Sequence, residues 1–387
     1  MRRSLVATQT QTMKALRYAK RLVGFESPSR HSNRLISRYL EMKLTKHGFV
    51  VEKLEYRDRR NVRKVNLVAK KGSGTGGLAY FAHSDTVPAD TWFTKRAGPF
   101  EPTVHQERLY GRGSCDMKGS IAAMLSAAQR FSWNELKAPL YFVVTADEEI
   151  GFYGARHVVN SSEHYREMVD GKTKVIIGEP TSLNVVHAHK GSIKIIAKAR
   201  GKAAHSSSGT GLNANLAMIP FLNEMKWIHD ETESDATWQN SLFDPPTVSW
   251  NIVVKDNSPA LNVKPAKSTC VVYFRTMPDV DITPLLDRTQ RCAQKHGIEL
   301  SLIKFSDPFY ADPESEFVTE SLRLANRPQP RTVSYGTDGG ILHELPEKIV
   351  FGPGSMEQAH TYDEWISLEQ LKLGTEMYEK MVRRWCC

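Results

Sequence analysis

The chain has 387 residues, of which 40% are hydrophobic and 25% charged, and its formal net charge is +9. This length suits two domains, at about 100–200 residues each, and the composition is that of a globular protein. No stretch approaches the about 20 consecutive apolar residues that a membrane-spanning helix needs, so we expect no membrane partner.

The distribution of basic residues and cysteines excludes further classes. The densest basic cluster, at 56–64, lacks interleaved aromatic residues, and no nucleic-acid-binding motif occurs, so we expect no nucleic-acid partner. The five cysteines include no Cys-x-x-Cys pair, which argues against a disulfide framework or a thiolate zinc site. The basic N-terminus lacks the continuous apolar core of a secretory signal. We therefore predict a soluble, cytoplasmic protein.

Helical patterns alternate with short apolar runs in the first part of the chain. Apolar residues at helical spacing near 16–23 predict an opening helix. Further helices are predicted over 33–47 and 119–131, and strands over 65–70, 78–82, 140–145, 174–178 and 348–352. Apolar runs flanked by helices indicate an α/β fold, with a mixed, mostly parallel sheet covered by helices on both faces.

The pattern changes between about 186 and 305. Strands are predicted over 192–201, 247–256 and 267–276, and amphipathic helices over 215–230 and 282–297. This βαββαβ-like order predicts an α+β domain that interrupts the first domain. We therefore expect a discontinuous catalytic domain over 1–185 plus 306–387 and an inserted domain over 186–305.

Titratable side chains follow four of the predicted strands, and one more follows a glycine-rich loop. In chain order they are His83 and Asp85, Asp116 in GRGSCDMKGS, Asp147, Glu148 and Glu149, Glu179, and His360. In open α/β sheets the functional site lies beyond the carboxyl ends of the strands. The sequence therefore predicts that these side chains converge.

Five of these side chains form a ligand set for metal ions: His83, Asp116, Glu149, Glu179 and His360. Imidazoles and carboxylates suit Zn²⁺, Co²⁺ or Mn²⁺. If Asp116 bridges, each of two metals gains one histidine, one terminal carboxylate and one bridging oxygen, as a hydrolytic two-metal site requires. Glu148 could then act as general base, and Asp85 could accept the other ring N–H of His83 and fix its tautomer.

Each of these residues also has an ordinary structural explanation. A Glu-Glu pair is often part of a solvated loop, Asp116 could be a turn residue, and His360 could cap a helix that starts near Asp363. The glycine-rich loop matches neither of the two common phosphate-binding patterns, G-x-x-x-x-G-K-[ST] and G-x-G-x-x-G. The metal hypothesis alone explains all five side chains together.

Six segments together resemble the M20 family of metallo-aminoacylases and peptidases: HSDTV, GRGSCDMKGSIAAML, TADEEIGFYGA, GEPTSL, KGSIKIIAKARGKAAHSS and GPGSMEQAHTYDEW. The branch they resemble most contains the acetylornithine deacetylases and succinyl-diaminopimelate desuccinylases. The resemblance implies a zinc-peptidase-like catalytic domain with two divalent metal ions, most simply Zn²⁺, and an inserted lid that forms a homodimer. It also implies a cis peptide after Asp116.

The implied activity is metal-dependent hydrolysis of a small anionic N-acyl amino acid, as in arginine biosynthesis. Three alternatives stay open: desuccinylation, cleavage of peptides by a dipeptidase or carboxypeptidase, and a non-catalytic, metal-bound binding protein. The catalytic roles that the resemblance implies fall on Glu148 as base, on Asp85 and on His205 of the inserted domain, which would polarise the substrate carbonyl, often across a dimer.

The resemblance also implies residues that bind substrate: Arg275, Asn262 and Gly354. His205 could instead be a plain surface histidine, and Arg275 could make only a structural salt bridge. Tyr273 stands where members of the family often have aspartate. This departure leaves the metal ligands intact and the identity of the substrate open.

Overall fold

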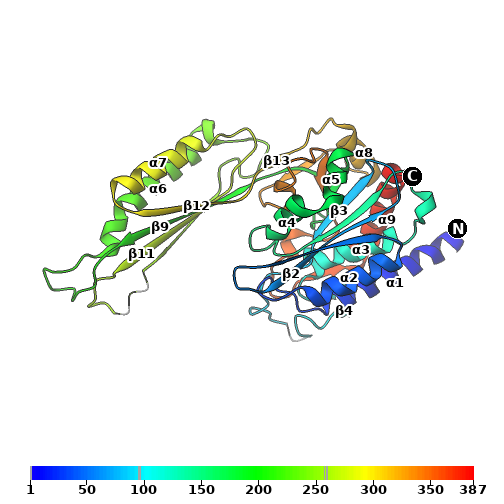
Figure 1. Ribbon diagram of the computed structural model, residues 1–387, viewed down its shortest axis with the longest axis horizontal. Helices are drawn as coiled ribbons and strands as arrows, with labels where there is room; N and C mark the ends of the chain where they lie inside the picture. The colour runs from blue at the N-terminus through cyan, green and yellow to red at the C-terminus, as the bar shows by residue number, and fades with distance from the viewer. Residues whose placement is uncertain (1, 95–96, 257, 259) are drawn as a thin grey trace. The chain divides into compact units, whose positions relative to one another are not determined.

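The computed structural model describes residues 2–94, 97–256, 258 and 260–387, and its chain divides into two compact units (Figure 1). Unit 1 comprises Met1–Ala188, Ala311–Arg331 and Thr337–Cys387, and unit 2 comprises His189–Tyr310 and Thr332–Gly336. Unit 2 is thus inserted in the sequence of unit 1. Among the described residues, no helix combines the length and the apolar character needed to cross a membrane.

A mixed sheet forms the core of unit 1, with its strands in the order β1-β2-β6-β3-β7-β15-β8. The strands are β1 (Val50–Arg57), β2 (Arg63–Lys71), β6 (Leu140–Thr145), β3 (Leu78–His83), β7 (Lys174–Ile177), β15 (Lys348–Val350) and β8 (Val186–His189). The four central strands β6, β3, β7 and β15 are parallel to one another, whereas β2 pairs antiparallel with β1 and β6, and β8 pairs antiparallel with β15. The predicted mixed sheet is confirmed, and its parallel pairs lie at the centre.

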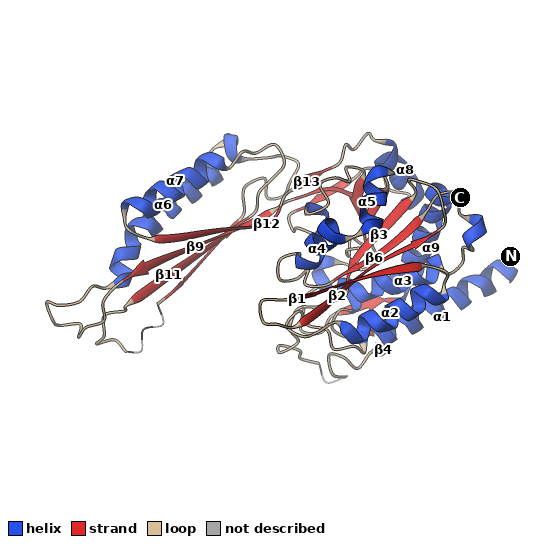
Figure 2. Cartoon of the chain, in the orientation of Figure 1, coloured by secondary structure: helices blue, strands red, loops and turns tan. Residues whose placement is uncertain are grey.

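Helices cover both faces of this sheet. Those of unit 1 are α1 (Arg2–Val23), α2 (Arg34–Lys46), α3 (Gly119–Ala128), α4 (Tyr153–Ser161), α5 (Glu163–Asp170), α8 (Glu316–Ala325) and α9 (Leu368–Cys386). Figure 2 shows α1, α2 and α3 on one side of the sheet and α4 and α5 on the other. Every residue of β3 and β6 is buried, as this double cover requires.

The loop before α3 is held in the core by close packing. All ten residues of α3 are buried, and α3 packs against α1, α9 and β3. A Cβ atom on Gly119, the first residue of α3, would lie 2.4 Å from the carbonyl oxygen of Ser114. Only glycine allows this approach, so the loop that contains Asp116 is fixed against the start of a buried helix.

A small second sheet joins two segments that lie far apart in the sequence. Its strands β4 (Thr103–His105), β5 (Arg108–Tyr110) and β16 (Trp365–Ser367) follow the order β16-β5-β4, and β16 pairs antiparallel with β5. The helix considered near Asp363 therefore begins later, at Leu368, where the Ser367 side chain accepts a hydrogen bond from the Gln370 amide.

Unit 2 is a sheet of order β10-β11-β9-β12 covered by two helices. Its elements are β9 (Ser192–Arg200), α6 (Ala214–Ser234), β10 (Trp250–Lys255), β11 (Lys267–Phe274), α7 (Thr283–Lys295) and β12 (Glu299–Ser306). The elements follow the predicted βαββαβ order. Each of the two helices leads into an edge strand of the sheet, α6 into β10 and α7 into β12. The short strands β13 (Phe309–Tyr310) and β14 (Arg331–Val333) lie where the chain passes between the units.

Candidate metal centre and catalytic site

The five side chains predicted as metal ligands lie together in unit 1. They form two groups that share Asp116, one with His83 and Glu179 and the other with Glu149 and His360. Within each group the ligand atoms lie within 4.8 Å of one another. The other four residues end or follow β3, β6, β7 and β15. Because these strands are parallel, their carboxyl ends meet at one edge of the sheet, which brings the side chains together.

The carboxylate of Asp116 lies between the two imidazoles. Its Oδ1 atom is 3.1 Å from His83 Nε2, and its Oδ2 atom is 3.2 Å from His360 Nε2. His83 Nε2 is also 3.7 Å from Oε1 of Glu179, and His360 Nε2 is 3.1 Å from Oε2 of Glu149. Asp116 therefore presents one oxygen to each group, which is the arrangement that a bridging carboxylate needs.

The electrostatics of the cluster fit divalent cations. Burial, and next the charge of Asp116, raises the pKa of both Glu149 and Glu179. Hydrogen bonds to Asp116 and Glu149 raise the pKa of His360 to about 10. The cluster thus retains protons because its negative charge is concentrated in a buried space. Divalent cations would neutralise the same charge, and the oxygen and imidazole ligands are of the kind that Zn²⁺, Co²⁺ and Mn²⁺ accept.

The main chain holds the orientation of the His83 ring. Its Nδ1 atom is 3.0 Å from the carbonyl oxygen of Asp85 and 3.6 Å from the Asp85 carboxylate. A carbonyl oxygen only accepts, so Nδ1 carries a proton and donates it to the carbonyl of Asp85. Nε2 faces the carboxylates of Asp116 and Glu179 and would offer its lone pair to a metal ion that displaces its proton. The nearer partner of the ring is thus the backbone of Asp85 and not the side chain that the sequence suggested.

The Asp85 side chain instead holds the loop after β6. Its Oδ2 atom accepts a hydrogen bond of 2.7 Å from the Ser29 hydroxyl. The backbone amides of Glu148 and Glu149 donate to its two oxygens at 3.3 and 3.4 Å. Asp85 therefore connects the end of β3 to the two glutamates that follow β6.

Glu148 has the surroundings that a general base needs. The residue is 9% exposed, and its carboxylate makes no hydrogen bond with any residue that the structure describes. Burial raises its pKa well above the ordinary value; His83 opposes this, and Glu179 adds to it. A carboxylate that is not engaged elsewhere and has a raised pKa is suited to accept a proton and to return it.

Two more buried charged groups lie beside the cluster, the Lys64–Asp147 pair and Asp338, and the sequence alone assigned a role to neither. The Lys64 amine lies 2.6 Å from Oδ1 of Asp147, and both side chains are buried. Asp338, in the segment GTDGG, accepts a hydrogen bond of 2.7 Å from the Thr145 hydroxyl, and burial raises its pKa to about 6. The partners of these groups could not be read from the sequence, because the tertiary fold brings them together.

A third missed residue, Glu364, contacts the loop that contains Asp116. Its Oε1 atom accepts hydrogen bonds from the amides of Cys115 and Asp116, at 2.8 and 2.9 Å. Its Oε2 atom accepts from the Gly113 amide at 2.8 Å and from the Arg112 guanidinium at 3.0 Å. The next peptide bond, Asp116–Met117, is cis, as the family resemblance implied. Glu364 lies in the segment GPGSMEQAHTYDEW beside another acid, and no local pattern shows that it contacts the loop with Asp116.

The three predicted residues of unit 2 fall at opposite ends of strand β11. His205 is exposed and pairs with Val263, and the amide of Ser206 donates to the carbonyl of Asn262 at 2.8 Å. Arg275 follows the other end of β11, with its guanidinium 5.1 Å from the Tyr273 ring. No carboxylate within the described ranges forms an ion pair with it. An eight-residue strand spans about 25 Å, so His205 and Arg275 of one unit cannot both contact one small molecule.

Gly354 is a buried backbone position beside Cys115. Its amide donates to the Gln370 side chain at 3.1 Å, and its carbonyl accepts from the Ser182 amide. Its φ is +95°, and a Cβ atom would lie 2.6 Å from the Cys115 sulfur, so only glycine fits. Its amide and carbonyl are therefore engaged with other parts of unit 1.

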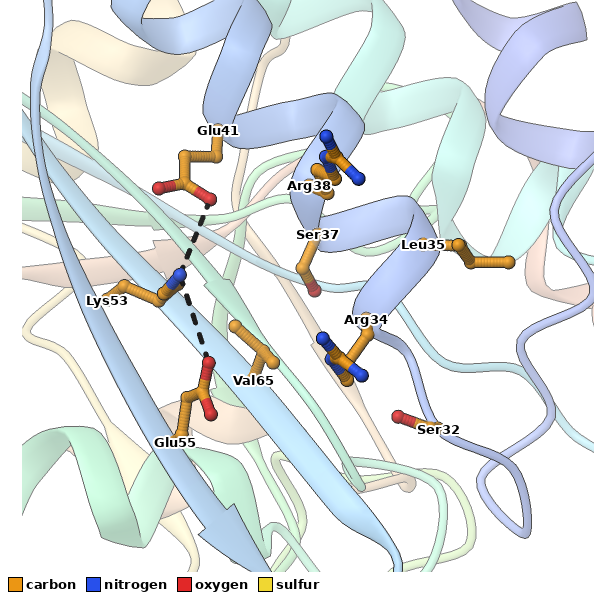
Figure 3. Close-up of a pocket in the computed structure, with 9 residues that line it drawn as sticks. All are labelled: Ser32, Arg34, Leu35, Ser37, Arg38, Glu41, Lys53, Glu55 and Val65. Carbon is orange, nitrogen blue, oxygen red and sulfur yellow. Dashed lines mark ion pairs between the residues drawn. The ribbon is translucent and has the colours of Figure 1, made fainter.

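A groove of about 560 Å³ lies between α2 and the strands β1 and β2 (Figure 3). Figure 3 shows Lys53 between two acidic side chains, with its amine 3.9 Å from Glu41 and 3.8 Å from Glu55. None of the predicted site residues lines this groove. Its acidic side chains are already paired with Lys53, so it offers no separate candidate for the chemistry.

The chain matches known proteins along most of its length. Residues 79–384 match Peptidase family M20/M25/M40. Acetylornithine deacetylase of Pasteurella multocida is 32% identical over 366 residues, which cover 92% of each chain. Acetylornithine deacetylase of Myxococcus xanthus is 32% identical over 390 residues, covering 97% of this chain and 99% of that one.

Solved structures share the fold at low sequence identity. An M20 family metallo-carboxypeptidase from Sulfolobus solfataricus is 16% identical with a TM-score of 0.75, covering 96% of this chain and 98% of that one. Human carnosine dipeptidase 1 is 17% identical with a TM-score of 0.73, covering 97% and 96%. These likenesses support the predicted fold class.

Proposed function

Because the chain belongs to Peptidase family M20/M25/M40 and is a metal-dependent hydrolase of amides, we propose that it removes the acyl group of an N-acyl amino acid, with N-acetylornithine as the first candidate. Two relatives named acetylornithine deacetylase, each 32% identical over more than nine tenths of the chain, support this substrate. The position of Asp116 between two histidines is the observation that carries the proposed two-metal site.

In this proposal His83, Asp116 and Glu179 hold one divalent ion, and Asp116, Glu149 and His360 hold the other. Zn²⁺ is the first choice, with Co²⁺ and Mn²⁺ as alternatives. When bound, such a pair would supply Lewis acidity and lower the pKa of a water molecule. A cytoplasmic location remains a prediction.

Glu148 moves the proton in the proposed reaction. Water adds to the acyl carbon, and the Glu148 carboxylate takes one proton from it. As the C–N bond breaks, Glu148 returns that proton to the amine nitrogen, so that a carboxylic acid and an amine leave; the acid then gives its remaining proton to the amine or to solvent. His205 would polarise the acyl oxygen, and Arg275 and Asn262 would bind the rest of the substrate, with Arg275 on the α-carboxylate.

The positions of His205 and Arg275 within unit 2 support a homodimer. They lie about 25 Å apart along β11, so one substrate cannot contact both from the same chain. If both act, His205 must come from a second copy. Asn262 lies beside His205 and would come from the second copy as well. In such a dimer, the end of unit 2 with Arg275 would serve the active site of its own chain, and the end with His205 and Asn262 would serve that of the other chain.

The decisive experiment is a substrate panel with metal-loaded protein. We expect hydrolysis of N-acetylornithine to exceed that of N-succinyl-diaminopimelate and of dipeptides. Glu148→Gln should keep two metals per chain and lose turnover by about 10²–10⁴-fold, because only the proton carrier is removed. Glu163→Gln, which alters an exposed glutamate of α5, serves as the matched control and should keep full activity.

The panel separates the alternatives. Preferred cleavage of dipeptides would favour the peptidase alternative, and preferred cleavage of the succinyl substrate would favour desuccinylation. Full activity of Glu148→Gln would refute the assigned base. A metal-loaded protein that cleaves no member of the panel would leave the binding-protein alternative.

A further inference from the structure

We propose that Glu364 is a positioning residue that sets the bridging carboxylate of Asp116, and that it acts through the backbone of the loop 112–116. The inference rests on the proposed two-metal site. Glu364 touches neither the proposed metals nor the substrate; its effect passes through Asp116.

Among the described residues, all the hydrogen bonds that the Glu364 carboxylate accepts come from the loop 112–116. Each carboxylate oxygen accepts two of them, Oε1 from Cys115 and Asp116 and Oε2 from Gly113 and Arg112, all between 2.8 and 3.0 Å. The amide of Asp116 itself is therefore fixed. Because the Asp116 side chain lies within 3.2 Å of both imidazoles, a displacement of its backbone would move one oxygen away from each ligand group.

The main chain at Glu364 and Trp365 is also held in place by hydrogen bonds. The carbonyl of Glu364 accepts a hydrogen bond of 3.0 Å from the Gly111 amide, and the next residue, Trp365, pairs with Tyr110 in the β16–β5 ladder. His360 lies four residues before Glu364 in the same segment. The segment 360–364 thus provides the proposed ligand His360 and also anchors the loop that contains Asp116. This fixes the positions of Asp116 and His360 relative to each other.

A buried acid in this place requires a negative charge. Glu364 and Arg112 are each 1% exposed, and their ion pair lies 3.0 Å apart. Glutamine has the same shape, but one of its two terminal atoms is a donor. The NH₂ group of glutamine would face two other donors, either two backbone amides or one amide and the Arg112 guanidinium. The two hydrogen bonds at that position would be lost, and the loop could shift. Partners that orient metal ligands typically change metal affinity by about 10–100-fold.

The test uses full-length protein and zinc itself as the probe. Glu364→Gln should weaken zinc binding by about 10–100-fold in a chelator competition. The visible absorption of Co²⁺ bound to the variant should differ from that of the wild type. Glu364→Asp keeps the charge near Arg112, should fold, and should recover part of the affinity. Ser162→Ala removes the N-cap of α5, away from the site, and should lower stability with unchanged zinc affinity.

Two outcomes would overturn the inference. One is a Glu364→Gln variant that is less stable but binds zinc as tightly as the wild type, as Ser162→Ala should. The other is a Glu364→Asp variant with no better affinity than Glu364→Gln. Failure of the wild type itself to bind zinc or to hydrolyse any panel substrate would instead contradict the proposed function, so the two failures are distinguishable.

Discussion

At the residue scale, Asp338 is a buried acid whose ionised form is poorly compensated. Thr145 donates one hydrogen bond to its Oδ2 atom, whereas Oδ1 has no hydrogen-bond partner among the described residues. Burial is the main reason that its pKa rises to about 6 from 3.8. The folded protein therefore holds a proton on Asp338 between pH 3.8 and about 6 that the unfolded chain has lost. Stability from this group is present at low pH and falls as the pH rises through this window.

We therefore expect Asp338→Asn to stabilise the metal-free protein above pH 6. Ionised Asp338 lowers the unfolding free energy of the wild type by up to about 3 kcal/mol, from roughly two pKa units at about 1.4 kcal/mol each. The substitution removes this charge. The gain in unfolding free energy should shrink as the pH falls toward about 4, where the wild-type carboxyl is also neutral. Urea unfolding of both proteins between about pH 4 and a pH above 6 measures this gain. A gain that does not change with pH would contradict the raised pKa of Asp338.

At the element scale, the approach of α4 to the end of β6 determines where the two glutamates of the loop lie. The amide of Gly154, near the start of α4, donates to the Ala146 carbonyl at 3.0 Å. A Cβ atom on Gly154 would lie 2.2 Å from that oxygen and 2.6 Å from the Ala146 nitrogen. Both contacts are backbone atoms, which cannot rotate away. The loop with Glu148 and Glu149 begins directly after Ala146.

Gly154→Ala should therefore impair both stability and catalysis. We expect a loss of about 1–3 kcal/mol in unfolding free energy, as overpacking causes, and reduced turnover at temperatures where the variant is fully folded. Gly24→Ala is the control, because a Cβ atom there would meet its nearest neighbour at 3.5 Å. Urea unfolding and steady-state kinetics measure the two effects. Wild-type turnover in folded Gly154→Ala would show that the helix does not position the loop.

At the scale of the whole molecule, the proposed dimer makes a prediction about mixed subunits. His205→Ala and Glu148→Gln chains should each be nearly inactive alone. In a mixed dimer, one site would combine an intact Glu148 with an intact His205 from the other copy. Random pairing of equal amounts should restore about a quarter of wild-type activity. Co-expression of differently tagged chains followed by kinetics measures this, and no recovery in purified mixed dimers would rule out action of His205 across the dimer.

The sequence by itself determined the elements and the ligand set of this protein. Amphipathic spacing predicted α2, α6 and α7 because helix periodicity is a local property. Apolar runs predicted β3, β6 and β7, and the acids and histidines after them predicted the cluster, because parallel strands end at one edge of a sheet.

Tertiary structure alone decided which groups surround that cluster. The helix considered near Asp363 gives way to a strand because β16 pairs with β5, more than two hundred residues earlier. The partners of Asp85, Asp338 and Glu364 come from distant segments, and a buried charge takes whichever donors the fold brings to it. Local patterns record propensity and periodicity, whereas these contacts depend on the packing of the complete chain.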